Sequence, residues 1–347
     1  MATLSARQPP SGGGAASGAF GHQPFDRAAI LERFPWLAPN DEPALLIIGD
    51  DLDAALSAVL FLHTHPRAQL AGVYHEYRRV HHAAGLTWEQ LLDGLWLDLD
   101  IYHPQVRSLG HHITRLDPGE SLPGFVHNCN PNTLAGISRQ HFRHKYPLGT
   151  IHFLLWLYAV EIPAHPHAEA LIWLADSAYI NGQTQSFKNG TPRAGFRWNV
   201  AEWLQVVLPL PSLLRSFAAL DTPEFEQRMA ALHRRMAQRG FVQGMGQVAS
   251  RHLQLAGYQC QPQGAIAPYL RNLLAFIAQH TGWMARPEQL SLLGKELRTR
   301  EGRRERADLA AVQRVGLRRF LEEQGIFSYV FDFSRRINYT VMSPAAP

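Results

Sequence analysis

The chain has 347 residues, of which 46% are apolar, and its formal net charge is +4, so a wholly disordered chain is excluded and two ordinary domains with a sizeable core are expected. Two cysteines, Cys129 and Cys260, exclude a disulfide framework and a Cys-x-x-Cys zinc ribbon, which favours the reducing cytoplasm. No apolar run reaches the roughly 18–20 residues of a membrane span, and no signal-peptide pattern opens the chain, so no membrane partner is expected.

The first half of the chain reads as alternating helices and strands. Residues 1–24 are rich in Gly, Ala, Ser and Pro and predict a flexible tail. A short helix over 25–34 follows, with Asp26 as its N-cap. The continuous apolar run 44–48 ends at Gly-Asp-Asp, which favours a strand buried on both faces. The next predicted elements are a helix over 53–63, a strand over 68–74, a helix opening at 87–90 and a strand over 94–99.

The remaining pattern sets the fold class. Apolar stretches at 150–160 and 168–178 complete an α/β domain over 25–205, expected as a parallel sheet flanked by helices. A proline-rich stretch places a domain boundary near 200–222. Residues 222–347 are then expected to form a smaller, mostly helical, basic domain. Its predicted elements are helices over 225–238, 247–255 and 267–279, and two short strands within 326–341.

Three acids follow the first predicted strand, in Gly-Asp-Asp-Leu-Asp. Ligands of a parallel sheet bind beyond the carboxyl ends of its strands, so Asp51 and Asp53 are placed to converge on one cation. Carboxylates and imidazoles suit Mg²⁺ or Mn²⁺. Capping of the next helix is the alternative for either acid, but with Asp50 there are more carboxylates than a cap needs, and they repel one another without a cation. Ser57, one helical turn after Asp53, is a candidate to hydrogen-bond a phosphate or a metal ligand.

Three further segments carry similar side chains. Asp98 and Asp100 follow the strand at 94–99, where alternation predicts both on one face; a solvent-facing edge is the alternative. In His111-His112, one imidazole is expected to ligate a metal and the other to orient it or contact a phosphate. Asp176 ends an apolar run, where burial is costly unless the carboxylate is paired or metal-bound; a cap or salt bridge is the alternative.

The order of these segments resembles the DHH phosphoesterase superfamily, which includes RecJ-like single-strand exonucleases, nano-RNases and cyclic-dinucleotide phosphodiesterases. The first motif of that family, D-x-D followed by small residues and Ser, matches residues 51–57. Its second motif matches Asp98, with Asp100 as competitor. Its Asp-His-His motif reads Gly110-His111-His112 here, and its fourth motif matches Asp176-Ser177. The resemblance covers roughly residues 43–185.

The resemblance implies two-metal hydrolysis of a phosphodiester with two Mn²⁺ (or Mg²⁺) ions. It implies catalytic roles for Asp51, Asp53, His111 and His112, and metal ligands at Asp51, Asp53, Asp98, Asp100, His111 and Asp176. Asp100 and Asp50 are both candidates for the carboxylate that Gly110 lacks. The Gly-rich motif of the usual second domain of the family is absent from the C-terminal half of the sequence.

Positive charge gathers near the C-terminus. Residues 295–319 hold nine Lys or Arg against four acids, a pattern that attracts a phosphate backbone. A solvated helix with Glu–Arg pairs is the alternative. Aromatic residues beside arginines can stack bases, although core packing is the plainer role for Phe331 and Phe333. The candidate substrate contacts are Ser57, His112, Arg143, Arg303, Arg304, Arg335 and Arg336.

The expected function is therefore a metal-dependent phosphodiesterase that hydrolyses single-stranded DNA or RNA. One alternative is a phosphodiesterase for cyclic dinucleotides or short oligonucleotides. Another, which Gly110 keeps open, is an inactive relative that binds nucleic acid or a helicase-like protein. A homo-oligomer is compatible with either.

Overall fold

The computed structural model describes residues 22–40, 42–188, 191–194, 196–241, 248–250, 253–256, 265–294, 296–331 and 335–343. Most of the predicted tail at 1–24 lies outside these residues, as do Cys260 and Phe333. Within the described ranges, no helix is long and apolar enough to cross a membrane.

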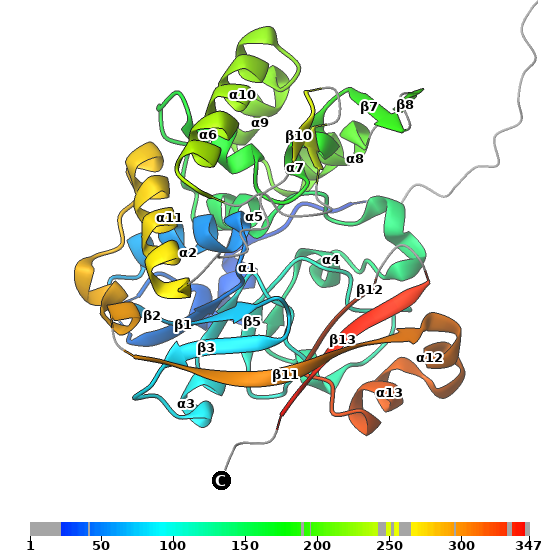
Figure 1. The fold of residues 1–347 in the computed structure, drawn as a ribbon. Helices are drawn as coiled ribbons and strands as arrows, with labels where there is room; N and C mark the ends of the chain where they lie inside the picture. Colours follow the sequence, from blue (N-terminus) through cyan, green and yellow to red (C-terminus); the bar gives the residue numbers. More distant parts are fainter. Residues whose placement is uncertain are drawn as a thin grey trace, which may run out of the picture.

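One nine-stranded sheet runs through the molecule in the order β12-β13-β11-β3-β2-β1-β4-β5-β6 (Figure 1). Its parallel half contains β2 (Ala68–His75), β1 (Ala44–Ile48), β4 (Leu95–Leu97), β5 (Arg107–Leu109) and β6 (Asn128–Cys129). Its antiparallel half adds β3 (Arg79–Ala83), β11 (Leu297–Asp308), β13 (Arg336–Met342) and β12 (Ser328–Phe331). The α/β prediction is confirmed. The parallel sheet is only partly confirmed, because β3 turns back on β2 and reverses the direction of pairing.

The strand β1 shows why the apolar runs form the centre of the sheet. Leu46 and Ile48 face the large core cluster, while Ile47 faces the smaller cluster on the other side. All three side chains are fully buried, as expected for a strand with covered faces. The large cluster also contains the buried helices α2 (Leu52–Thr64) and α5 (Thr150–Leu157), and the smaller one contains residues of α3 (Trp88–Leu92).

Among the other helices, α6 to α10 gather in one group at the top of the view in Figure 1. Asp26 caps α1 as predicted, and two of the three helices expected beyond residue 222 are confirmed as α10 and α11. The bounds are α1 Arg27–Arg33, α4 Pro131–Leu134, α6 Ala168–Trp173, α7 Ala178–Gly182, α8 Arg197–Glu202, α9 Pro211–Ala219, α10 Pro223–Gln238, α11 Ile266–Thr281, α12 Leu309–Val315 and α13 Leu317–Glu323. Short 3-10 helices are η1 Pro35–Leu37, η2 Pro123–Phe125, η3 Arg139–His144 and η5 Pro287–Gly294, and η4 Trp203–Val207 is a π-helix.

The helix predicted over 247–255 is wrong. The described residues of this segment form β9 (Val248–Ser250) and β10 (Leu255–Ala256), which pair antiparallel. The side chain of Ser250 accepts a hydrogen bond from the backbone of Leu253 and so stabilises a turn instead of a helix. A second small antiparallel pair joins β7 (Gln185–Lys188) to β8 (Thr191–Ala194).

The basic segment at 295–319 is not one solvated helix. Its first part is the strand β11, which pairs with β3 on one side and β13 on the other, and α12 and α13 follow. Gly302 is needed where β11 crosses the β2–β3 hairpin, because a Cβ there would lie 2.9 Å from the carbonyl oxygen of Arg78. The domain boundary at 200–222 stays a prediction. Strands from both sides of it belong to one sheet, since β11, β12 and β13 extend the sheet formed by β1 to β6.

Candidate metal centre

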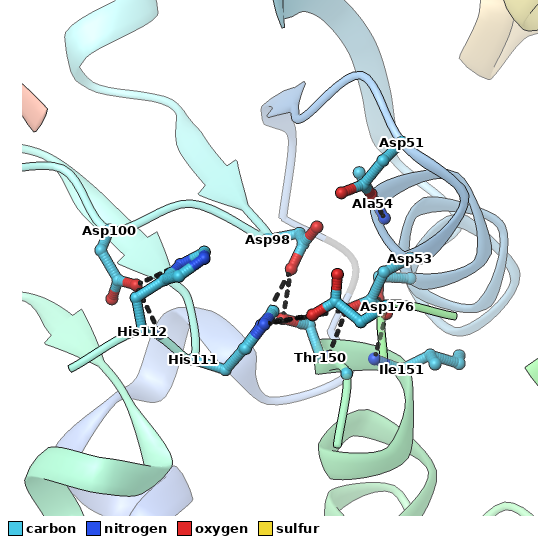
Figure 2. Close-up of polar contacts among 12 residues, drawn as sticks. Asp51, Asp53, Ala54, Asp98, Asp100, His111, His112, Thr150, Ile151 and Asp176 are labelled. Atoms are coloured by element: carbon cyan, nitrogen blue, oxygen red, sulfur yellow. Dashed lines mark hydrogen bonds and ion pairs between the residues drawn. The ribbon is translucent and has the colours of Figure 1, made fainter. Parts of the chain in front are cut away.

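The predicted acids and histidine meet at the carboxyl edge of the parallel strands (Figure 2). Asp51 and Asp53 open α2 after β1, Asp98 follows β4, and His111 follows β5. Asp176 arrives from the loop between α6 and α7. One ligand atom from each of Asp53, His111 and Asp176 lies within 4.8 Å of the other two. The structure therefore brings together four segments that are far apart in the chain.

His111 is the centre of this cluster. Its Nε2 lies 2.5 Å from Oδ2 of Asp176, and its Nδ1 lies 3.2 Å from Oδ1 of Asp98 and 3.0 Å from Oγ1 of Thr150. Burial alone would lower the pKa of His111, but the carboxylates of Asp176 and Asp98 raise it well above its usual value. Burial raises and His111 lowers the pKa of Asp176, which falls to about 2. The raised pKa of His111 and the lowered pKa of Asp176 both favour an ion pair between these two side chains.

Asp53 is fully buried and tied to the start of α5. Its carboxylate accepts hydrogen bonds from the backbone N–H groups of Thr150, at 2.6 Å, and Ile151, at 2.9 Å. Such N–H groups at a helix start favour an anion. Gly149 permits this approach, because a Cβ on it would lie 2.5 Å from Oδ2 of Asp53.

Thr150 is a site residue that sequence reasoning missed. Its hydroxyl donates to Oδ1 of Asp98 at 2.6 Å and lies beside His111, so it orients both groups. The one feature of the sequence that could have indicated Thr150 is the Gly149-Thr150 pair at the start of an apolar helix. The same pair is also common at the start of helices that have no functional role.

Asp51 combines the two roles that were considered for it. It caps α2 by accepting a 2.9 Å hydrogen bond from the N–H of Ala54, and it also lines the cleft at the site. Burial, then the nearby Asp176 and Asp53, raise its pKa well above the ordinary value. Burial and Asp98 raise the pKa of Asp53 in the same direction. These carboxylates destabilise one another unless protons or cations neutralise them.

The prediction that Asp98 and Asp100 share one face of a strand is wrong. The strand β4 ends at Leu97, and Asp98 adopts a left-handed backbone conformation with φ of 62°. Asp176 is also left-handed, with φ of 50°. Non-glycine residues in this conformation cost free energy and gather at functional sites. The turn at Asp98 directs its side chain to His111, whereas Asp100 points elsewhere.

Asp100 lies in a separate polar nest beside His112. It accepts hydrogen bonds from the Nδ2 atoms of Asn128 and Asn130 and from the backbone N–H of His112, at 2.7 to 3.1 Å. Burial raises its pKa, but these hydrogen bonds and His112 lower it below the usual value overall. Direct metal ligation by Asp100 is therefore not favoured, since its lone pairs already hold donors. A Cβ on Gly110 would lie 2.5 to 2.6 Å from both oxygens of this carboxylate, so Asp100 fills the space of the missing side chain.

A cleft of about 410 Å³ opens beside the cluster, and we call it the acidic cleft. Of the predicted arginines, Arg304 lines it; Arg78 and Tyr77, which were not predicted, line it as well. The residues that line the acidic cleft are Asp50, Asp51, Glu76, Tyr77, Arg78, Asp98, His111, His112, Asp176 and Arg304.

The other predicted substrate contacts lie elsewhere. Ser57 is fully buried and donates to Asp53 at 3.5 Å, so of its two expected partners, a phosphate or a metal ligand, the structure gives it the ligand. Arg303 alternates with Arg304 along β11 and pairs with Glu305 instead. Arg143 is exposed on η3, and Arg335 and Arg336 are exposed at the start of β13; none of them lines the acidic cleft.

The donor set fits a hard divalent cation. Carboxylates and one imidazole converge, while Cys129 is buried in the core cluster and contributes no thiolate. A second group in the described ranges, His22, His144 and Glu202, also has ligand atoms within 4.8 Å of one another, but it lies away from the strand ends. No family model, no curated protein and no solved structure matches the chain.

The charges predict how pH and metal act on stability. Burial, with the charge of Asp51, raises the pKa of Asp98 from 3.8 to about 7, and the pKa of His111 is also raised. Protons on both groups stabilise the fold, so the metal-free protein loses stability as pH rises through 7. We expect its Tm to fall between pH 5 and pH 8. Mn²⁺ should raise Tm more at pH 8 than at pH 5, because it replaces the lost protons. Thermal unfolding with EDTA or Mn²⁺ measures this, and an equal rise at both pH values would contradict it.

Proposed function

We propose that this protein is a divalent-metal-dependent phosphodiesterase that hydrolyses single-stranded nucleic acid. The observation that carries the proposal is the convergence of Asp53, His111 and Asp176, with Asp51 and Asp98 beside them, at the carboxyl edge of a parallel sheet. Buried carboxylates at this density repel one another, and a cation is the usual means of keeping them together. The open acidic cleft gives a substrate access to the same point.

The residues that would hold two Mn²⁺ or Mg²⁺ ions are Asp51, Asp53, Asp98, His111 and Asp176. When bound, such a pair activates water and stabilises the charge on the leaving oxygen. The hydroxyl of Thr150 hydrogen-bonds to both His111 and Asp98 and so orients these two proposed metal ligands. The N–H groups of Thr150 and Ile151 at the start of α5 donate to the carboxylate of Asp53 and hold it in place.

His112 is suited to contact the substrate. About 36% of its side chain is exposed, against 9% for His111, and it lines the acidic cleft. Its Nδ1 lies 3.4 Å from Asp100, which also holds its backbone N–H. Asp100 thus orients His112 toward the cleft while His111 faces the acids.

The same arrangement supports a likeness to the DHH phosphoesterases. The four motifs that suggested this family lie at one site, the first three after the neighbouring strands β1, β4 and β5 and the fourth in the loop between α6 and α7. Gly110 stands where the Asp-His-His motif has an aspartate, and the carboxylate of Asp100 occupies the space that a side chain at residue 110 would need.

A cleavage assay tests the proposal. Labelled single-stranded DNA and RNA and a cyclic dinucleotide are incubated with Mn²⁺ or with EDTA. We expect cleavage of the linear strands with Mn²⁺ only. Cleavage of the cyclic dinucleotide alone would assign the substrate to the alternative enzyme class. Binding of the strands without cleavage of any substrate would overturn the enzyme proposal.

Arg304 is expected to hold a phosphate of the substrate. Arg304→Met should weaken the binding of single-stranded DNA and lower the slope of log affinity against log salt by about one. Arg303→Met is the matched control, because this neighbour is on the other face of β11 and pairs with Glu305. Fluorescence anisotropy at several salt concentrations gives both slopes. Equal effects of the two substitutions would contradict a specific role for Arg304.

A further inference from the structure

A second cleft, of about 280 Å³, is lined in part by the same histidines, and we call it the aromatic cleft. It shares His111, His112 and Asp176 with the acidic cleft, so the two open onto one centre. Its own walls come from η3 and the following loop, the start of α7, and β12. The strand β12 therefore brings a C-terminal wall to a site whose ligands lie before residue 180.

The walls of the two clefts differ in chemistry. The acidic cleft is lined by carboxylates and by Arg78 and Arg304, which suits phosphates and cations. The aromatic cleft holds Phe142, Tyr146 and Phe331, with one cation, Lys145. The Nζ of Lys145 lies 5.2 Å from the ring centroid of Phe142. The site is thus asymmetric about His111.

Two of the aromatic rings are placed to contact a ligand. Phe142 and Phe331 are half-buried, so part of each ring faces the cleft, whereas Tyr146 is almost fully buried. Tyr146 packs against Trp203 and donates its hydroxyl to the carbonyl of Gly149. Tyr146 therefore forms a fixed floor, and the two phenylalanines form the sides.

We propose that the aromatic cleft holds one nucleobase of the substrate, next to the phosphate that is cleaved, while the phosphate backbone on the other side follows the acidic cleft. This inference rests on the proposed function and extends it to a nucleoside-specific subsite. Aromatic side chains stack bases of any sequence, and each stacked base contributes about 5- to 150-fold in affinity. The volume is near the lower end of small-molecule sites, which leaves space for a single base and its sugar.

Lys145 has a separate role in this subsite. It follows η3 and lines the aromatic cleft together with Asp176, and its Nζ lies over the ring of Phe142. That position suits a phosphate attached to the bound nucleoside. The base and its phosphate are then recognised by different residues, and the two contributions are separable by mutation.

Binding of two small probes tests the proposal without a need for turnover. Adenosine 5′-monophosphate and ribose 5-phosphate are titrated into the Mn²⁺-loaded protein by calorimetry. We expect the nucleotide to bind at least about 5-fold more tightly, because only it carries a base. Phe142→Leu keeps apolar volume and should reduce this ratio toward one. Lys145→Met should weaken both probes alike, and Phe196→Ala, at an exposed position away from the cleft, should change neither.

The outcomes separate this inference from the function on which it rests. Equal affinity for the two probes, or no binding of either, would overturn the nucleobase subsite even if Mn²⁺-dependent cleavage of DNA or RNA is observed. A preference for the nucleotide that Phe142→Leu abolishes would support the subsite even if no strand is cleaved. Thermal unfolding of each variant shows whether the fold is retained, and Phe331→Leu gives a second test if Phe142→Leu fails to fold.

Discussion

Replacing Asp176 with asparagine is expected to reduce Mn²⁺-dependent hydrolysis by at least about 100-fold in kcat/KM. Outer-shell partners of metal ligands already contribute about 10- to 100-fold, so a carboxylate in contact with His111 should contribute no less. Asparagine keeps the shape of the side chain and tolerates the left-handed backbone at this position, where φ is 50°. The protein should therefore fold normally and lose the charge alone. Initial rates on labelled single-stranded DNA measure the effect.

The matched control is Asp117→Asn, which makes the same chemical change at an exposed position that contacts Gln140. Its rate should stay within about twofold of wild type, since surface substitutions away from special features have small effects. If the Asp176 variant cleaves as fast as the control, the proposed role of Asp176 in catalysis is wrong.

Introducing an aspartate at residue 110, as in the Asp-His-His motif of the DHH phosphoesterases, is expected to destabilise this protein by about 3 kcal/mol or more. A Cβ on Gly110 would lie 2.5 to 2.6 Å from both oxygens of Asp100, a separation that real Cβ atoms do not show. Gly110→Asp would also bury a second carboxylate beside the first, where like charges repel. Urea denaturation of the metal-free protein gives the free energy of unfolding.

A compensating change tests whether Asp100 is responsible. Asp100→Ala alone should be destabilising, because it leaves the side-chain donors of Asn128 and Asn130 unpaired. In the double variant with Gly110→Asp, the new carboxylate can occupy the space left by the side chain of Asp100 and accept hydrogen bonds from Asn128 and Asn130. We expect the double variant to be more stable than the sum of the single changes predicts, by about 1 kcal/mol or more. Strict additivity of the two effects would show that the positions do not share one carboxylate site.

The parts of the fold that were predictable are those where a run of residues carries its own signal. The run ALLII is too short for a helix and too apolar for an exposed edge, and it forms β1 in the centre of the sheet. The cap at Asp51 and the apolar residues after it defined α2 in the same way. Because Asp51 and Asp53 lie directly between these two elements, they could be named from the sequence. His111 was named instead from the His111-His112 pair and its place soon after Asp98.

The failures come from contacts between distant segments. Nothing near residue 300 shows that β11 pairs with β3, more than 200 residues earlier, so its charges also fitted a helix. The left-handed turn at Asp98 separates it from Asp100, and local alternation cannot predict such a turn. Ser57 faces inward because α2 is buried along nearly its whole length. Thr150 became a site residue only when α5 came to lie beside α2.

The central claim is that Asp51, Asp53, Asp98, His111 and Asp176 hold divalent cations. A count of bound Mn²⁺ per chain, by equilibrium dialysis followed by elemental analysis, tests it most directly. The wild-type protein is expected to bind about two ions at this site. Asp176→Asn should lose at least one of them, and Asp117→Asn should lose none. A wild-type chain that retains no Mn²⁺, or a count that Asp176→Asn leaves unchanged, would contradict the claim.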